Sequence, residues 1–145
     1  MSPLISLAVF AVVGAGVSIF WLKRLANQSE KRMREQFPAA KAIVRGANFF
    51  GQESRGKAQL RGNGTFVLTD TEIVFERWVP RAEFRIPFAA IQTVDTANAF
   101  LGKRIGRKLL HVRFRSETGD LDSMAWYVPD LHGLMNQIER LKSHA

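Results

Sequence analysis

The sequence predicts a mainly β protein in which one apolar N-terminal helix precedes an antiparallel barrel of about seven strands and one C-terminal amphipathic helix. Three observations lead to this prediction: an uncharged run over residues 4–22, alternating apolar and polar residues from Gly64 onward, and helical spacing of apolar residues near the C-terminus. The 145 residues suffice for one modest domain. Because the chain contains no cysteine, a disulfide framework, a thiolate metal site and a cysteine nucleophile are excluded.

The uncharged run is long enough to cross a bilayer. Its 19 residues would span about 28 Å as a helix, close to the ~30 Å thickness of the hydrocarbon layer. The competing interpretation, a cleaved secretory signal, requires basic residues before the apolar core and small residues after it. Nothing basic precedes Leu4, and Trp21-Leu22-Lys23-Arg24 ends the run. We therefore expect a transmembrane helix over 4–22, preceded by a short flank over 1–3.

The basic residues that follow this run predict an orientation. No Lys or Arg precedes it, and five lie within residues 23–34. Since cytoplasmic flanks are enriched in Lys and Arg, we expect the N-terminus outside and a cytoplasmic body. Trp21, Lys23 and Arg24 are expected at the membrane interface. The basic helix and linker over 23–41 either attracts anionic lipid or only sets the topology.

The net charge of +8 is concentrated in the first part of the chain. Residues 1–61 contain ten Lys and Arg against three Asp and Glu, whereas residues 62–145 are nearly balanced. A nucleic-acid binder more often carries its excess charge on a folded face or a recognition helix. We therefore expect no nucleic-acid partner.

After Pro38 the pattern changes from helical to extended. Leu110, Val112 and Phe114 alternate with polar residues, which is typical of an antiparallel sheet with one buried face. Turn residues separate the successive runs. The predicted strands cover residues 42–48, 65–69, 72–79, 83–86, 91–96, 108–115 and 121–128.

The last segment predicts an amphipathic helix. Its apolar residues recur at intervals of three and four, and Asp130 is a suitable N-cap. We expect the apolar stripe to pack on the open edge or mouth of the sheet. The stripe consists of Leu131, Leu134, Met135, Ile138 and Leu141.

Four motifs lie in the extended part of the chain: GNGTFVLTDTEIVFERW (62–78), RIPFAAIQTVDT (85–96), LLHVRF (109–114) and DSMAWYVPDLHGLMNQIERL (122–141). They resemble those of the pleckstrin-homology-like superfold, in particular GRAM and bacterial PH-like domains, over about residues 42–143. Phe66 and Ile73 stand where leucines are usual in such domains. The resemblance implies a binding or adaptor module, often beside a membrane, with phosphoinositide, anionic lipid or peptide as ligand.

A basic loop over residues 102–108 is the candidate binding site. A loop kinked by Gly102 and Gly106 can direct backbone amides and cations toward a phosphate group. The alternative is a solvated connection between strands that discourages edge-to-edge aggregation, and both interpretations stay open. The candidate residues for anionic lipid or another anion, two of them on the following strand, are Lys103, Arg104, Arg107, Lys108, His111 and Arg113.

No catalytic or metal-binding pattern is present in the sequence. Asp120 and Asp122 flank a tight turn, where aspartate hydrogen-bonds the backbone, and the three histidines lack the spacing of metal ligands. We expect no enzyme activity, no cofactor and no metal. The predicted function is a membrane-anchored PH/GRAM-like module that engages anionic lipid headgroups or a membrane-protein partner. The alternative is an assembly subunit of a membrane complex without a ligand of its own.

Overall fold

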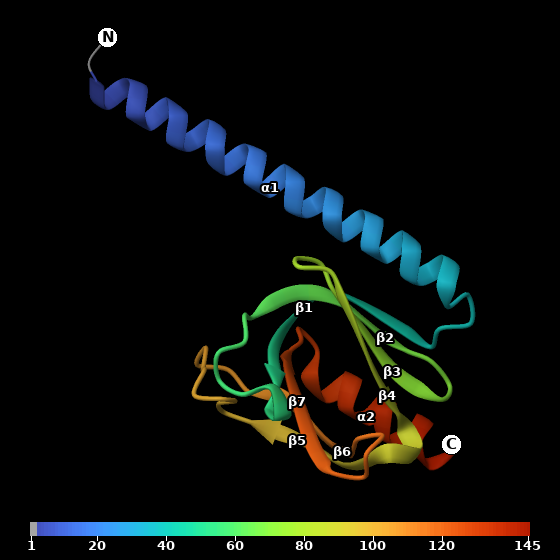
Figure 1. The fold of residues 1–145 in the computed structure, drawn as a ribbon. Helices are drawn as coiled ribbons and strands as arrows, with labels where there is room; N and C mark the ends of the chain where they lie inside the picture. The colour runs from blue at the N-terminus through green and yellow to red at the C-terminus, as the bar shows by residue number, and fades with distance from the viewer. Residues whose placement is uncertain (1–2) are drawn as a thin grey trace.

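A computed structural model describes residues 3–145, with side chains from residue 11 onward. The chain forms a long N-terminal helix, a seven-stranded antiparallel sheet and a C-terminal helix (Figure 1). Residues 1 and 2 of the predicted flank lie outside the described residues. The elements are α1 (Pro3–Gln36), β1 (Ala42–Gln52), β2 (Gly62–Leu68), β3 (Glu72–Arg77), β4 (Ala82–Pro87), β5 (Ile91–Ala97), β6 (Leu109–Arg115), β7 (Leu121–Tyr127) and α2 (Leu131–Ser143), with short 3-10 turns at Glu53–Arg55 and Phe88–Ala90.

β1 is the central strand of the sheet, whose order is β4-β3-β2-β1-β7-β6-β5. Its first half, from Ala42, pairs with β2 alone, and its second half, from Asn48, also pairs with β7. The register shifts at Gly46, which has a φ of +81° and therefore adopts a conformation that favours glycine. Such a bulge bends the strand, so β1 can belong to both halves of a curved sheet.

The sheet is open, so the predicted barrel is wrong. β4 and β5 are its two edges, and no ladder joins them within residues 3–145. A cleft of about 570 Å³ separates Glu83 and Arg85 of β4 from the β6–β7 turn. Alternation along a strand reports which face is buried and not whether two edges meet, so the sequence did not show this opening. With its two helices the fold is α+β, not mainly β.

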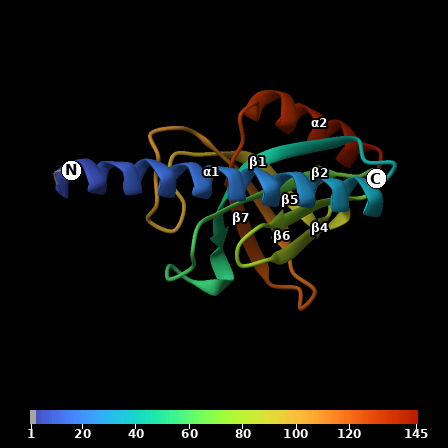
Figure 2. The ribbon, with the colours of Figure 1, turned by 90° about the horizontal axis from the view of Figure 1, so that it is seen from above.

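The concave face of the sheet holds the main core, and α2 covers it (Figure 2). Trp126 and Phe66 pack edge to face with ring centroids 5.1 Å apart, and Leu134 and Ile138 of α2 lie in the same cluster. Asp130 accepts a hydrogen bond from the Gly133 amide at 3.1 Å. The prediction of a capped, amphipathic C-terminal helix is therefore confirmed.

The second half of α1 packs on the outer face of β2 and β3. Met33 is fully buried and forms a cluster with Val67 and Val74. The helix ends at Gln36, just before Phe37-Pro38, because proline disfavours the helical conformation of the preceding residue. α1 is thus partly a component of the folded body.

The predicted membrane-spanning helix over 4–22 needs correction. The helix itself is present, since α1 runs from Pro3 to Gln36. Residues 4–10 lie outside the part whose side chains are described. No helix in the searched part of the chain combines the length and the apolar character that a bilayer crossing requires.

Other predictions depended on that span and are wrong with it. The outside N-terminus and cytoplasmic body were derived from the charges that flank 4–22. The membrane-anchored lipid-binding function, and its alternative of a subunit in a membrane complex, also assumed an anchor that the described residues do not provide.

Candidate interaction surface

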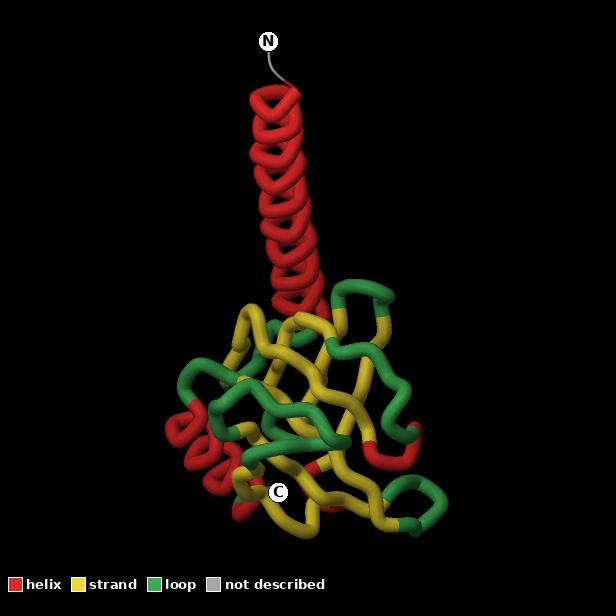
Figure 3. The backbone as a smooth tube through the Cα atoms, turned by 90° about the vertical axis from the view of Figure 1, so that its left-hand side faces the viewer, coloured by secondary structure: helices red, strands yellow, loops and turns green. Residues whose placement is uncertain are grey.

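The apolar arm, residues 11–22 of α1, projects beyond the folded body (Figure 3). Successive helical residues point about 100° apart, so its large side chains face every direction around the axis. An exposed apolar surface of this kind marks an interaction site. These side chains, between 44% and 73% exposed, belong to Val12, Val13, Val17, Ile19, Phe20, Trp21 and Leu22.

The sequence assigned Trp21, Lys23 and Arg24 to a membrane interface. The structure places all three exposed on α1, where the apolar arm ends and the basic part of the helix begins. The membrane-interface role predicted for these three residues depended on a membrane-spanning helix, which the described residues do not show.

A buried hydrogen-bond network fixes α1 to the sheet. The Oγ atom of Ser29 lies 2.8 Å from Oγ1 of Thr65, and both residues are fully buried. Nε1 of Trp78 donates to the same Thr65 oxygen at 3.1 Å. Because a buried polar group without a partner is costly, these bonds favour one position of the helix on β2.

An ion pair joins α1 to β3. Glu76 is 1% exposed, and its carboxylate accepts a hydrogen bond from Nη2 of Arg32 at 2.5 Å. Nε of Arg81 lies 3.6 Å from the other carboxylate oxygen. A buried carboxylate requires such partners because removal from water destabilises its charge. Sequence reasoning missed this pair, although a glutamate next to the apolar run 73–75 was a signal.

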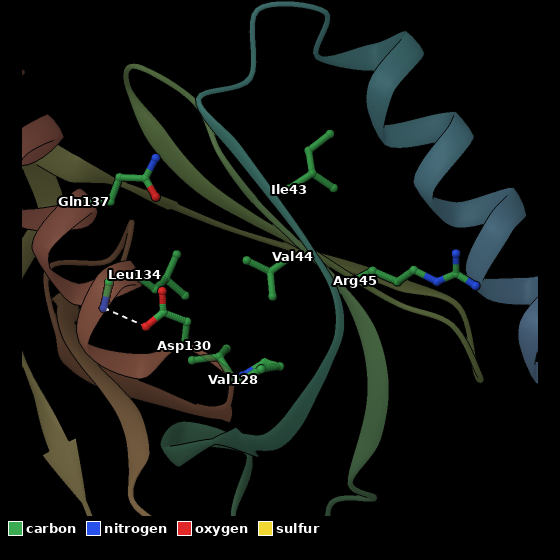
Figure 4. Close-up of a pocket in the computed structure, with 9 residues that line it drawn as sticks. Ile43, Val44, Arg45, Val128, Asp130, Leu134 and Gln137 are labelled. Atoms are coloured by element: carbon green, nitrogen blue, oxygen red, sulfur yellow. Dashed lines mark hydrogen bonds between the residues drawn. The ribbon is translucent and has the colours of Figure 1, made fainter.

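A second surface feature, the β1–α2 groove, lies between the first half of β1 and the N-terminal part of α2 (Figure 4). It has a volume of about 370 Å³. Val44 points toward α2, whereas Ile43 and Arg45 point to the side of α1. The lining residues are Ile43, Val44, Arg45, Val128, Pro129, Asp130, Gly133, Leu134 and Gln137.

The strand register explains the groove. β7 pairs with β1 only from Asn48 onward, where Tyr127 is its last partner, and the chain then turns at Pro129 into α2. Residues 42–46 of β1 therefore have β2 on one side and no strand on the other within residues 3–145. The groove is an open strand edge beside a helix.

The groove combines an apolar floor with a polar rim. Val128 and Leu134 belong to the main core cluster, and Val44 is partly buried against it. At one end, Nε2 of Gln137 donates to the backbone oxygen of Lys41 at 3.3 Å. A side chain of α2 is thus hydrogen-bonded to the backbone just before the open edge of β1.

The basic loop predicted as the anion site folds down onto the sheet. It covers a small apolar cluster formed by Phe50, Phe100, Leu109 and Ala125 on the outer face. Nζ of Lys103 donates to the backbone oxygens of Phe50 at 3.3 Å and Gln59 at 2.8 Å. Lys103 therefore holds the loop against β1.

The other candidate residues do not converge on one point. Nη1 of Arg107 donates to the Tyr127 hydroxyl at 3.0 Å. Nδ1 of His111 lies 2.8 Å from a carboxylate oxygen of Asp95. Arg104, Lys108 and Arg113 are exposed, and none forms an ion pair in the described part of the chain. Anion binding by these six residues stays a prediction.

The contacts of Lys103 predict that its substitution destabilises the protein more than substitution of the neighbouring Arg104. We expect Lys103→Met to lower the free energy of unfolding by about 1–2 kcal/mol, because two carbonyl groups lose a charged donor. Arg104→Met, next in sequence and exposed, is the matched control and should change it by less than about 0.5 kcal/mol. Urea denaturation measures both, and equal effects would contradict the role of Lys103.

Asp122 ties the β1–β2 loop to β7. Its carboxylate accepts hydrogen bonds from Nε2 of Gln52 at 2.6 Å, from Oγ of Ser54 at 2.7 Å and from the Ser54 amide at 3.0 Å. Burial alone would raise the pKa of Asp122, but the hydrogen bonds from Ser54, Gln52 and the Ser123 amide outweigh it and lower that pKa. Asp122 thus lies on β7 and holds a distant loop, rather than bonding only the backbone of the turn beside it.

A lowered pKa makes the contribution of Asp122 dependent on pH. The stabilisation is fully present above the ordinary pKa of about 4 and is lost as pH falls through the lowered value. We expect Asp122→Asn to lower the free energy of unfolding by about 1–2 kcal/mol at neutral pH. The difference from wild type should shrink below about pH 4. Denaturation at a series of pH values measures it, and a constant difference would contradict this assignment.

Among the described residues, no group of three or more His, Asp or Glu side chains has a geometry that could hold a metal ion.

The comparisons with known proteins concern the fold alone. No family model matches the sequence, and no curated protein does. The C-terminal domain of an unknown protein from Leishmania infantum is similar in structure, with a TM-score of 0.54, 13% identity, and coverage of 78% of this chain and 96% of that one. A chain of the 8S snRNP assembly intermediate is also similar, with a TM-score of 0.52, 9% identity, and coverage of 73% and 80%. The chain thus shares its fold, over most of its length, with known structures.

Proposed function

We propose that the protein is a non-enzymatic interaction module with a PH/GRAM-like body, whose apolar arm inserts into a partner protein. The exposed apolar surface of residues 11–22 is the observation that carries this proposal. The PH/GRAM-like assignment is supported by the motifs over 62–141 and by α2 on the concave face of the curved sheet.

The shape of the arm indicates what kind of partner fits it. A helix that is apolar all round is normally enclosed, so a single helix packed along one side would leave part of it in water. The partner therefore offers an apolar channel, such as the space between helices of a bundle. Lys23 and Arg24 follow the arm directly, and acidic residues at the mouth of the channel would complement them.

The rigid attachment of α1 also supports a binding role. Ser29 and Arg32 fix the second half of the helix to the sheet, and the same helix continues into the arm without a break. The arm is thus presented in a defined direction relative to the body. Such preorganisation lowers the entropic cost of association.

The experiment places the photoreactive amino acid p-benzoylphenylalanine at Val17 or Phe20 of the full chain in cells. Leu121, which is 65% exposed on β7, is the control position. We expect one discrete protein adduct from both arm positions and none from Leu121. Adducts with lipid alone, with a second copy of the chain, or with no molecule would overturn the proposal.

Purified components provide the second measurement. The partner identified by mass spectrometry should bind the full chain and lose about a hundredfold in affinity for the double variant Val13→Asp and Phe20→Asp. Leu121→Asp is the control, because it introduces an aspartate at an exposed apolar residue of the body. Equal loss for the control would contradict binding through the arm.

A further inference from the structure

We infer that the β1–α2 groove binds an extended, acidic segment of a protein, which adds to β1 as a further strand. This inference rests on the proposed function only in that the chain is a protein-binding module. The surface is separate from the apolar arm, since residues 42–46 and the start of α2 form it.

The open edge of β1 is the first support. Five residues, 42–46, have a strand on only one side, which corresponds to an edge about 17 Å long. In an antiparallel strand, alternate residues direct their amide and carbonyl groups to opposite sides. The groups that face away from β2 require a hydrogen-bond partner, and an extended backbone provides donors and acceptors at the matching spacing.

The two faces of the added strand would meet different surfaces. On one face Val44, Val128 and Leu134 form an apolar floor at the margin of the main core. Side chains alternate between faces along a strand, so every second residue of the bound segment would contact this floor. Valine, isoleucine or leucine suits these positions, and a volume of about 370 Å³ leaves space for them.

On the α1 side of the groove, Arg45 belongs to a cluster with more guanidinium groups than carboxylates. Asp130, the other charged residue of the groove lining, caps α2. Glu30 of α1 is shared between Arg34, at 2.8 Å, and Arg45, at 3.6 Å. Two guanidinium groups thus have one carboxylate between them, and the side chains of Arg34 and Arg45 are 62% and 44% exposed. An acidic side chain of the bound segment would provide a second carboxylate, which makes the preferred occupant acidic.

A large side chain in place of Gln137 would block the groove without altering a core residue. It is half-buried at the rim, and its hydrogen bond to the Lys41 oxygen is long at 3.3 Å. A tryptophan at this position would fill the space above Val44. Asn136, the preceding residue of α2, is exposed outside the groove lining, so Asn136→Trp is the matched control.

The test uses random dodecapeptides displayed on filamentous phage, selected on the full chain and counter-selected on Gln137→Trp. We expect the selected peptides to alternate aliphatic with acidic residues. A synthetic copy of the strongest peptide should bind Gln137→Trp at least about tenfold more weakly than wild type, and Asn136→Trp equally well. Arg45→Glu should weaken it by about tenfold, whereas Arg113→Glu should not.

Amide hydrogen exchange locates the bound peptide. Slower exchange within residues 42–46, and not along β4 or β5, is the expected result. Three results would overturn the inference: no peptide that distinguishes wild type from Gln137→Trp, protection at another edge, or protection of 42–46 by a second copy of the chain without peptide. The two proposals can fail independently. If no peptide binds the groove but Val17 and Phe20 still crosslink to a partner protein, this inference is overturned and the proposed function is not.

Discussion

Replacing Gly64 with alanine is expected to lower the free energy of unfolding by more than about 3 kcal/mol. Gly64 lies on β2 opposite Arg77 of β3. An added Cβ atom would meet the backbone oxygen of Glu76 and the ring of Phe75 at distances that real Cβ atoms do not show. Both obstacles belong to the neighbouring strand, so the β2–β3 ladder would have to separate. Urea denaturation followed by tryptophan fluorescence measures the loss.

Gly14 provides the control for this substitution. A Cβ atom there would have no neighbour within 4 Å. Alanine is also favoured over glycine within a helix by about 1 kcal/mol. Gly14→Ala should therefore leave the stability of the body unchanged and raise the helicity of the apolar arm slightly. A mild effect of Gly64→Ala, comparable to that of Gly14→Ala, would contradict the close approach of β2 and β3.

Replacing Arg32 with methionine is expected to lower the free energy of unfolding by about 2–3 kcal/mol. Glu76 is 1% exposed and, among the residues whose side chains are described, would keep Arg81, at 3.6 Å, as its one charged partner. The same change should loosen α1 from the sheet, because Arg32 links the helix to β3. Denaturation measures the stability, and hydrogen exchange of residues 26–36 measures the attachment of the helix.

Two further variants distinguish the stabilisation by the buried Arg32–Glu76 pair from the smaller effect of an exposed ion pair. Glu76→Gln in the Arg32→Met background should recover part of the loss, since a neutral amide tolerates burial better than a carboxylate. Arg34→Met removes the exposed pair with Glu30 and should cost less than about 0.5 kcal/mol. If Arg32→Met behaved like Arg34→Met, α1 would be held by its apolar contacts alone.

The elements of the sheet could be predicted because their signals are local. Leu110, Val112 and Phe114 alternate along β6 and face the core together. Leu134 and Ile138 recur at helical spacing and are the buried residues of α2. Each of these patterns depends on the direction of neighbouring side chains within one element, which the backbone geometry dictates.

The features that the sequence did not predict depend on contacts between segments far apart in the chain. The ion pair of Arg32 with Glu76 joins residues far apart in the chain, and the carbonyl partners of Lys103 belong to other loops and strands. The β1–α2 groove arises because β7 ends opposite Asn48, a register that no periodicity encodes. The barrel was mispredicted because local hydrophobicity does not report whether the two edge strands of a sheet pair with each other. The membrane span was mispredicted because local hydrophobicity does not report what surrounds an apolar helix.

The position of β1 between two halves of the sheet has a consequence during synthesis. β2, β3 and β4 follow β1 as consecutive hairpins, whereas β7, its other neighbour, begins only at Leu121. At translation rates of 5–20 residues per second, roughly 3 to 12 s separate the emergence of β2 and β7. Throughout that interval the second half of β1, with Phe49 and Phe50, lacks the strand that later covers it. The nascent chain therefore presents an incomplete sheet with an unpaired strand, and completion of the last quarter of the chain ends that period.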